Sequence, residues 1–253
     1  MTDQFAAWMR DLEARHLADL TFAEVSRALR ALSSTYVERR STLAEGAALA
    51  GAGKRAAFAL FYSPLHYLLV HHIVAALDAA NGRVSTLVDL GCGTGPAGAA
   101  WAASFDSTPQ VVGIDRHPWP LAEAAQTYRQ FGIKARTRQG DVTASEWSPS
   151  PSACIAAFTL NELTDAGRDA MWSRLADRRR SPVLIVEPLA GFVAPWWRQW
   201  SDAVLKAGGR ADEWRFKVEL PAIVAKLDRA AGLNHRELKG RSLWLGKSNP
   251  SDF

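Results

Sequence analysis

The feature that most restricts the fold is a set of three alternate glycines that follows directly on an apolar run. The run, from Thr86 to Leu90, has the length and the branched side chains of a buried strand. Gly91, Gly93 and Gly95 come next, and glycine adopts left-handed backbone angles that other residues rarely take. Because glycine also lacks a side chain, the main chain of such a turn can approach a ligand closely. The sequence therefore predicts a buried strand that ends in a ligand-binding turn.

Strands and helices are predicted to alternate from this turn onward. Strands are predicted at residues 86–90, 111–115, 135–140, 154–160, 183–187, 214–220 and 242–245. Helical patterns lie between them at residues 97–104, 120–131, 165–179, 195–207 and 221–231. This alternation favours an α/β fold with a doubly wound, mostly parallel sheet. In such a sheet the ligand binds beyond the carboxyl ends of the strands, where the direction of winding reverses.

The first 83 residues form a separate predicted part, because helical periodicity runs through them. Large apolar residues recur there at spacings of three and four: Phe5, Trp8, Met9, Leu12, Val25, Leu29 and Leu32. We predict an N-terminal helical segment at residues 1–83, which caps the site or recognises the substrate. A cofactor-binding domain is predicted at residues 84–253.

One stretch of the N-terminal segment is long and apolar enough to suggest a membrane span. Residues 56–77 contain no Asp, Glu, Lys or Arg. Ser63 and Pro64 interrupt the stretch, since serine is a common helix N-cap and proline a common first helical residue. We therefore predict two short buried helices here and no membrane partner.

Composition narrows the classes of partner and site. Cys92 and Cys154 lie far apart without a CxxC pattern, so we expect neither a disulfide framework nor a metal site. The first ten residues lack the apolar core of a secretory signal, and together these features favour a cytoplasmic protein. The net charge of +4 allows a nucleic-acid partner without requiring one.

Acidic residues stand at the ends of the second and third predicted strands. Asp115 ends the second strand, where a carboxylate can accept hydrogen bonds from both hydroxyls of a ribose. Asp141 follows Gly140 at the end of the third, where an acid can accept from the amino group of adenine. Either acid alone could simply cap a helix or form a turn. With the glycine turn, however, the strand ends together predict an adenosine-binding site.

At this point the sequence resembles the class I S-adenosylmethionine-dependent methyltransferases. The resemblance rests on residues 88–95, 113–115, 140–141 and 184–188 and covers roughly residues 86–246. It implies a Rossmann-like, seven-stranded methyltransferase sheet in which the strands near Trp214 and Ser242 form a closing antiparallel pair. It also implies S-adenosylmethionine as cofactor and S-adenosylhomocysteine as product. The domain at residues 84–253 would then be the S-adenosylmethionine-binding methyltransferase domain.

The resemblance further implies which residues meet the cofactor. Asp89 is expected near its methionine end, Asp115 at the ribose and Asp141 at the adenine amine. His117 or Trp119 would flank the adenine ring. The expected cofactor-binding residues are Asp89, Gly91, Cys92, Gly93, Gly95, Asp115, Arg116, His117, Gly140, Asp141, Val142 and Thr159.

Catalytic and substrate residues are predicted after the fourth and fifth strands. Asn161 and Glu162 follow the fourth, where methyltransferases present groups to the acceptor, and Glu162 is a candidate base. A helix-capping role is the alternative for both. Glu187, Trp196 and Trp197 are predicted to contact the substrate, although Glu187 could anchor a loop and the tryptophans could pack a helix against the sheet.

A second, looser resemblance concerns the methyl acceptor. Residues 159–163 and 186–192, with the helical lead-in 55–77, are similar to the small-ribosomal-subunit methyltransferase-like family. Leu189 departs from that family's glycine, and the cysteines of its metal-binding mitochondrial members are absent. This resemblance implies a ribosomal-RNA acceptor, or a non-catalytic cofactor-binding role in ribosome assembly. Small-molecule methyltransferases show a comparable pattern, so a small-molecule acceptor stays open.

A nicotinamide-dependent oxidoreductase is the remaining alternative. Residues 93–98 match the GxGxxG pattern of dinucleotide-binding domains, with an acid some twenty residues further on. Asp89 and the Gly140-Asp141 pair count against it, because dinucleotide binding requires neither. The oligomeric state is not indicated by the sequence.

Overall fold

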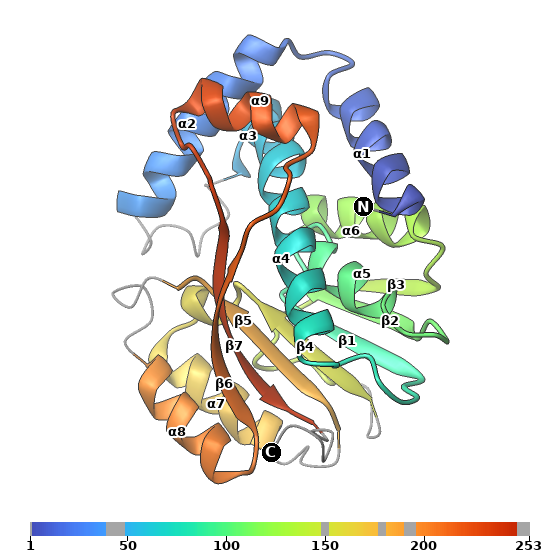
Figure 1. The fold of residues 1–253 in the computed structure, drawn as a ribbon, viewed down its shortest axis with the longest axis vertical. Coiled ribbons are helices and arrows are strands. Elements are labelled where there is room, and N and C mark those ends of the chain that lie inside the picture. Colours follow the sequence, from blue (N-terminus) through green and yellow to red (C-terminus); the bar gives the residue numbers. More distant parts are fainter. Residues whose placement is uncertain (1, 39–48, 148–151, 177–180, 190–195, 247–253) are drawn as a thin grey trace. The chain divides into compact units, whose positions relative to one another are not determined.

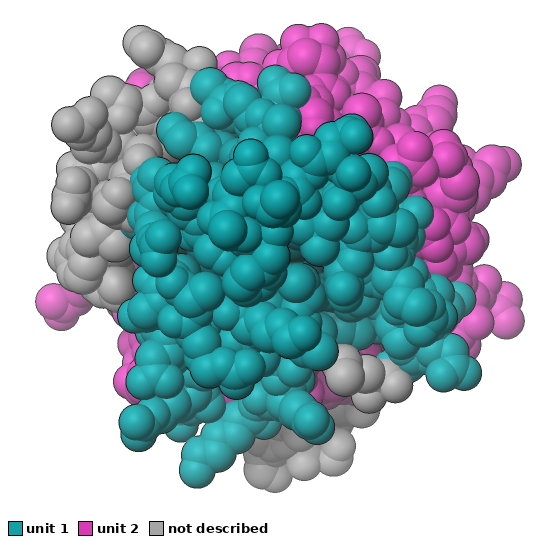
Figure 2. Space-filling model, turned by 90° about the horizontal axis from the view of Figure 1, so that it is seen from above, with its two compact units in different colours: residues 1–66, 217–238 teal, residues 67–216, 239–253 magenta. Residues whose placement is uncertain are grey.

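The computed structural model describes residues 2–38, 49–147, 152–176, 181–189 and 196–246, with only the backbone at residues 34–38. These residues form two compact units, one of residues 1–66 with 217–238 and one of residues 67–216 with 239–253 (Figure 2). The division does not coincide with the predicted boundary between residues 83 and 84. Residues 67–83 belong with the sheet, since the ring of Tyr67 stacks on that of Phe131 with centroids 4.8 Å apart. The roles assigned to the two predicted parts stay predictions.

The first unit is helical. It contains α1 (Asp3–His16), α2 (Phe22–Glu38), α3 (Ala52–Ala57), the π-helix η3 (Phe58–Tyr62), the start of α4 (Ser63–Ala76), and α9 (Ala222–Ala231). Thr21 and Glu24 form a reciprocal cap at the start of α2, with Glu24 Oε2 accepting from Thr21 N at 2.8 Å. The guanidinium of Arg30 donates to the carbonyl of Ala230 at 3.0 Å and thereby ties α2 to the end of α9.

Residues 52–76 form one continuous helical stretch, so the prediction of two separate helices is wrong. The backbone N–H of Ser63 donates to the carbonyl of Phe58, five residues earlier, and the serine hydroxyl donates to the same oxygen. This π turn accommodates Pro64, which has no N–H to donate, without breaking the helix. By length and composition the stretch could cross a membrane, but 72% of its apolar window is buried inside the protein, as in a core helix.

The second unit is built on a seven-stranded sheet (Figure 1). Its strands are β1 (Thr86–Leu90), β2 (Gln110–Asp115), β3 (Ala135–Gln139), β4 (Ala153–Ala157), β5 (Val183–Glu187), β6 (Arg210–Phe216) and β7 (Leu238–Leu245). Their order is β3-β2-β1-β4-β5-β7-β6, with β1 to β5 mutually parallel and β7 antiparallel to β5. The predicted doubly wound α/β sheet is confirmed. Its winding reverses between β1 and β4, so the carboxyl ends of five strands share one edge.

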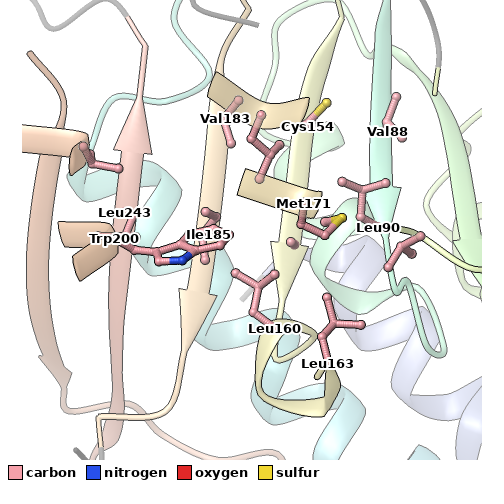
Figure 3. Packing of buried hydrophobic residues seen from close by; sticks show 14 of the residues in the cluster. Val88, Leu90, Cys154, Leu160, Leu163, Met171, Val183, Ile185, Trp200 and Leu243 are labelled. Carbon is pink, nitrogen blue, oxygen red and sulfur yellow. The ribbon is translucent and has the colours of Figure 1, made fainter. Parts of the chain in front are cut away.

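Helices cover both faces of this sheet (Figure 1). Residues 67–76 of α4, α5 (Pro96–Ala102) and α6 (Pro118–Gln130) lie on one face, and α7 (Asp165–Ala176) and α8 (Trp197–Lys206) on the other. On the second face Ile185 and Leu243 pack with Met171 of α7 and Trp200 of α8 (Figure 3). Trp200 is therefore a core residue. Burying such side chains stabilises the fold by roughly 1.5–3 kcal/mol each and fixes the strand ends in place.

Candidate active site

The glycine turn after β1 bends over the end of β2. Gly91, Gly93 and Gly95 all have positive φ, at 67°, 51° and 83°. The amide of Gly91 donates to the carbonyl of Ile114 at 2.8 Å, and the amide of Gly93 donates to Oδ2 of Asp115 at 2.9 Å. The end of β2 therefore fixes the conformation of the turn.

The three glycines serve the fold in different ways. A Cβ at Gly91 would collide with the side chain of Thr159, and one at Gly95 would lie about 3 Å from Ala124 and Tyr128 of α6. At Gly93 a Cβ would meet no atom within 4 Å. Gly91 and Gly95 thus allow close packing, whereas Gly93 leaves open space beside the end of β2.

Asp89 points into the protein rather than to the open side of the turn. Its Oδ2 accepts from the Tyr128 hydroxyl at 2.8 Å and from the Gly98 amide at 3.0 Å, and the residue is 1% exposed. Burial raises the pKa of Asp89 to about 7, although both hydrogen bonds oppose that shift. The thiol of Cys92 is also buried, and burial raises its pKa. The side chains of both residues therefore support the turn from within.

Asp115 collects backbone donors from two segments. Besides the Gly93 amide, it accepts from the His117 amide through Oδ1 at 2.9 Å. Each carboxylate oxygen has a second lone pair, so two further hydrogen bonds remain open to a ligand. The predicted ribose-binding acid thus lies directly beside the open space at Gly93, with His117 next to it.

The ends of β2 and β3 are joined to each other. Gly140 donates its amide to the carbonyl of Asp115 at 2.9 Å, and Arg116 pairs with Oδ2 of Asp141 at 2.7 Å. Oδ1 of Asp141 accepts from both the amide and the hydroxyl of Thr143. These bonds and the charge of Arg116 outweigh desolvation and lower the pKa of Asp141. Asp141 is therefore a carboxylate held at the same edge as Asp115.

Two other predicted cofactor residues mainly hold the structure together. The Val142 side chain is buried in the core, and its carbonyl accepts from Trp147 and Arg174 at 3.1 Å each. Thr159 donates its hydroxyl to the carbonyl of Leu90 at 2.9 Å and so joins the end of β4 to β1. Phe158 precedes it with φ of 59°, a left-handed angle that is strained for a phenylalanine.

The candidate catalytic residues follow on the short helix η4 (Leu160–Glu162). Glu162 is exposed to solvent, yet desolvation by the surrounding protein and the charge of Asp115 raise its pKa to about 7. Asn161 instead turns its amide to the carboxylate of Glu187. Glu162 is thus an accessible group within electrostatic reach of Asp115.

Glu187 is fully buried at the end of β5. It accepts from the amide of Leu160 at 2.9 Å and from the side chain of Asn161. Burial, opposed by the Leu160 bond and reinforced by Glu162, raises the pKa of Glu187 to about 8. The sequence predicts that Glu187 either contacts the substrate or anchors a loop. Its bonds to Leu160 and Asn161 anchor the loop after β4, and contact with the substrate stays a prediction.

Trp196 and Trp197 lie at the start of α8 and pack against the core while staying partly accessible. Their ring centroids are 5.7 Å apart, and the guanidinium of Arg241 lies over the Trp197 ring at 4.2 Å. The packing alternative is thus right in part, and contact with the acceptor stays a prediction.

The sequence did not indicate a role for three residues that support the carboxyl ends of the strands. Tyr128 and Arg241 lie far along the chain from the residues they meet, and neither sits in a recognisable motif. Phe158 carried no signal because a left-handed angle is not typical of phenylalanine.

The strand ends fit an adenosyl cofactor. Gly93 provides open space, Asp115 retains acceptor capacity, and Asp141 lies on the adjoining strand end. The carboxylates of Asp115 and Glu162 also suit a ligand that carries a positive sulfonium. Within the described ranges, no group of three or more His, Cys, Asp or Glu side chains is arranged to hold a metal ion.

Comparisons with known proteins agree with this geometry. Residues 87–180 match a family model described as a methyltransferase domain. A search of curated proteins gives no match. Among solved structures, a putative O-methyltransferase from Nostoc punctiforme is 12% identical, with 74% of this chain and 59% of that chain covered and a TM-score of 0.52.

Two further solved structures are more distant in shape. An S-adenosylmethionine-dependent methyltransferase from Aquifex aeolicus is 13% identical, with 72% and 93% of the chains covered and a TM-score of 0.48. Magnesium protoporphyrin IX methyltransferase from Synechocystis, with bound S-adenosylmethionine, is 16% identical, with 72% and 80% covered and a TM-score of 0.47. None of these matches concerns the small-ribosomal-subunit family, so that resemblance stays a prediction.

The matched stretch contains the whole candidate cofactor site. It begins in β1 and extends through the glycine turn, Asp115, Asp141 and Glu162. Its description is that of a methyltransferase domain and not of a dinucleotide-dependent oxidoreductase. Residues 87–180 are therefore a methyltransferase domain, for which S-adenosylmethionine is the implied cofactor.

Proposed function

We propose that the enzyme methylates an O–H or N–H group and that Glu162 receives the proton released from that group. S-adenosylmethionine supplies a methyl group that is already activated on a sulfonium. What the protein must add is alignment of the acceptor with that methyl, and removal of the proton. The observation that carries this proposal is the exposed Glu162 carboxyl on η4, directly after β4 and near Asp115; its raised pKa also favours a base that works near neutral pH.

The position of Glu162 supports this role. Asp115, the proposed ribose ligand, lies close enough to influence the Glu162 carboxyl electrostatically. A base at that place stands beside the cofactor without being buried beneath it. Asn161 is fixed by Glu187, and we assign it to orientation of the acceptor.

For the cofactor, we assign direct contacts to the open side of the strand ends. Gly93, Asp115 and Asp141 would meet the adenosyl moiety, with Arg116 and His117 beside them. The remaining predicted residues would act mainly by holding the turn and the strands in place: Asp89, Gly91, Cys92, Gly95, Gly140, Val142 and Thr159.

Our first candidate acceptor is ribosomal RNA of the small subunit. Besides the sequence resemblance, exposed cations along the edge strand support it: Lys134 directly before β3, and Arg136 and Arg138 within it. Residues two apart in a strand share a face, so these charges form a row that suits a phosphodiester backbone.

Both cysteines are free, which supports a reducing compartment such as the cytoplasm.

A small-molecule acceptor is the second candidate. The carboxylates of Asp115, Asp141 and Glu162 at the strand ends repel a polyanion and favour a small substrate. The partly accessible rings of Trp196 and Trp197 suit a flat ligand.

Incubation with methyl-labelled cofactor separates these candidates. The protein would be offered small-subunit particles in one reaction and a small-metabolite extract in another, with the Glu162→Gln variant as control. Label in RNA that the variant does not produce supports the first candidate, and label in small solutes supports the second. Label in neither, despite cofactor binding, would contradict methyl transfer and favour a non-catalytic assembly factor. RNA binding should also weaken steeply as salt is added.

A further inference from the structure

Arg241 is a buried arginine, one edge of whose guanidinium makes no hydrogen bond to the described residues. The residue is 4% exposed, and neither Nε nor Nη2 finds a hydrogen-bond acceptor in the described part of the chain. A buried donor without an acceptor destabilises the fold, and more so when the donor is charged. A fold keeps such a group readily when a ligand supplies the missing acceptors.

The surroundings of Arg241 leave this edge unsatisfied. On β7 it lies opposite Glu187 of β5 in the antiparallel ladder, and its guanidinium rests over the ring of Trp197. The Glu187 carboxylate is already engaged by the Leu160 amide and the Asn161 side chain. Burial also raises the pKa of Glu187, so near neutral pH much of it is uncharged. The charges of Glu187 and Glu213 offset part of the burial that lowers the pKa of Arg241, but neither carboxylate hydrogen-bonds its Nε or Nη2.

The two unpartnered nitrogens define the shape of the missing ligand. Nε and Nη2 form one edge of the planar guanidinium, and their N–H bonds along that edge are parallel. Two coplanar oxygens of a carboxylate or phosphate match this fork. A single water would satisfy only part of it.

Adjoining residues carry unpartnered polar atoms as well. Oδ1 of Asn161 is buried and accepts from no donor in the described ranges, although Nδ2 of the same amide donates to Glu187. Nε1 of Trp196, next to Trp197, is buried and finds no acceptor among the residues that the structure describes. The unsatisfied donors of Arg241 and Trp196 thus occur together with an unsatisfied acceptor, Oδ1 of Asn161. Asn161 directly precedes Glu162 in the chain. A ligand with an oxyanion and a hydrogen-bond donor would complete them.

We infer that Arg241 binds an oxyanion of the methyl acceptor, a carboxylate or a phosphate, and that Oδ1 of Asn161 accepts a hydrogen bond from the same molecule. Only the identification of this ligand with the acceptor rests on the proposed function. The oxyanion site itself rests on the geometry of Arg241. A carboxylate would come from a small molecule, and a phosphate from a nucleotide or from RNA.

The test follows the Nε–H resonance of Arg241 in ¹⁵N-labelled full-length protein with S-adenosylhomocysteine bound. The resonance is assigned by its loss in Arg241→Lys, a variant that must still bind S-adenosylhomocysteine as the wild type does. The probes are sodium acetate and inorganic phosphate, each compared with sodium chloride at equal ionic strength. Lys239→Gln serves as matched control, because it removes an exposed positive charge from the same strand.

We expect at least one probe to shift the Nε–H resonance of Arg241 in a saturable way. The same shift should occur in Lys239→Gln. The same probe should also stabilise the protein against heat. In Arg241→Gln, the probe concentration that gives half of this stabilisation should be roughly tenfold higher or more. Saturation by acetate supports a carboxylate acceptor, and saturation by phosphate a nucleotide or RNA. Shifts no larger than those in sodium chloride would overturn the inference.

The two proposals can fail separately. Methyl transfer with no oxyanion binding at Arg241 would contradict this inference and leave the proposed function standing. Oxyanion binding at Arg241 in a protein that transfers no methyl group would support the site and contradict the proposed function.

Discussion

The phenolic hydroxyl of Tyr128 donates to Oδ2 of Asp89 at 2.8 Å, and both side chains are buried. This bond joins the last turn of α6 to β1, directly before the glycine turn. The same oxygen accepts from the amide of Gly98 in α5. One carboxylate therefore holds two helices against the strand that carries the turn.

Tyr128→Phe should destabilise the protein by about 1–2 kcal/mol, because it removes a donor from a buried carboxylate. Urea unfolding of the variant and the wild type measures the difference. Loss of this donor should also raise the pKa of Asp89 further, since the tyrosine bond now lowers it. A variant as stable as the wild type would show that the bond does not hold the helices in place.

Buried carboxyl groups predict that stability falls as pH rises. Glu187 has a folded-state pKa of about 8, above its ordinary value of 4.5, so the native state keeps a proton that the unfolded chain loses. The free energy of unfolding should therefore decrease between about pH 4.5 and pH 8. Glu187→Gln should reduce this slope, as measured by urea unfolding near pH 5 and pH 8. Glu219→Gln, at an exposed position, should leave it unchanged.

Gly93 and Gly132 allow strain to be separated from ligand contact. Both have positive φ, and at both a Cβ would meet nothing within 4 Å. Gly93→Ala and Gly132→Ala should each lose roughly 1 kcal/mol of stability, the usual strain of a left-handed alanine. Calorimetry with S-adenosylhomocysteine should show weaker binding for Gly93→Ala alone. Equal affinities for the two variants would mean that the cofactor does not occupy the space at Gly93.

Glu162→Gln should lower kcat roughly 10²–10⁴-fold if the carboxylate is the base. The wild-type rate should rise with pH through about 7, the pKa of Glu162, because only the carboxylate form accepts a proton. The variant should lose that inflection and keep its affinity for S-adenosylhomocysteine. Asp169→Asn, an exposed position on α7, is the matched control and should behave as the wild type. An unchanged inflection in Glu162→Gln would assign the base to another group.

Local sequence signals predicted the sheet and the glycine turn well. The predicted strands overlap all seven observed ones, and the largely apolar runs of β1, β4 and β5 are typical of buried parallel strands. The strand predicted at 154–160 ends earlier, at Ala157, since Phe158 turns the chain with a left-handed angle. The strand predicted at 214–220 lies at Arg210–Phe216, where alternating burial gave only a weak pattern.

Contacts between distant parts of the chain could not be predicted in this way. Nothing near Asp89 indicates that Tyr128 is its partner, because 39 residues and a strand separate them. Arg241 enters the site from β7 only through the antiparallel pairing with β5. The helix through Ser63 and Pro64 continues because a π turn absorbs the proline, which local preferences do not reveal.

The central claim is that the ends of β1, β2 and β3 together bind S-adenosylmethionine. Calorimetry of wild type, Asp115→Ala and Asp106→Ala with S-adenosylhomocysteine and with NADH tests it most directly. We expect S-adenosylhomocysteine to bind the wild type and Asp106→Ala alike, because Asp106 is an exposed acid in the turn before β2. Asp115→Ala should bind roughly ten- to a hundredfold more weakly, as expected for lost bonds to a carboxylate. Tight binding of NADH with no heat from S-adenosylhomocysteine would contradict the claim.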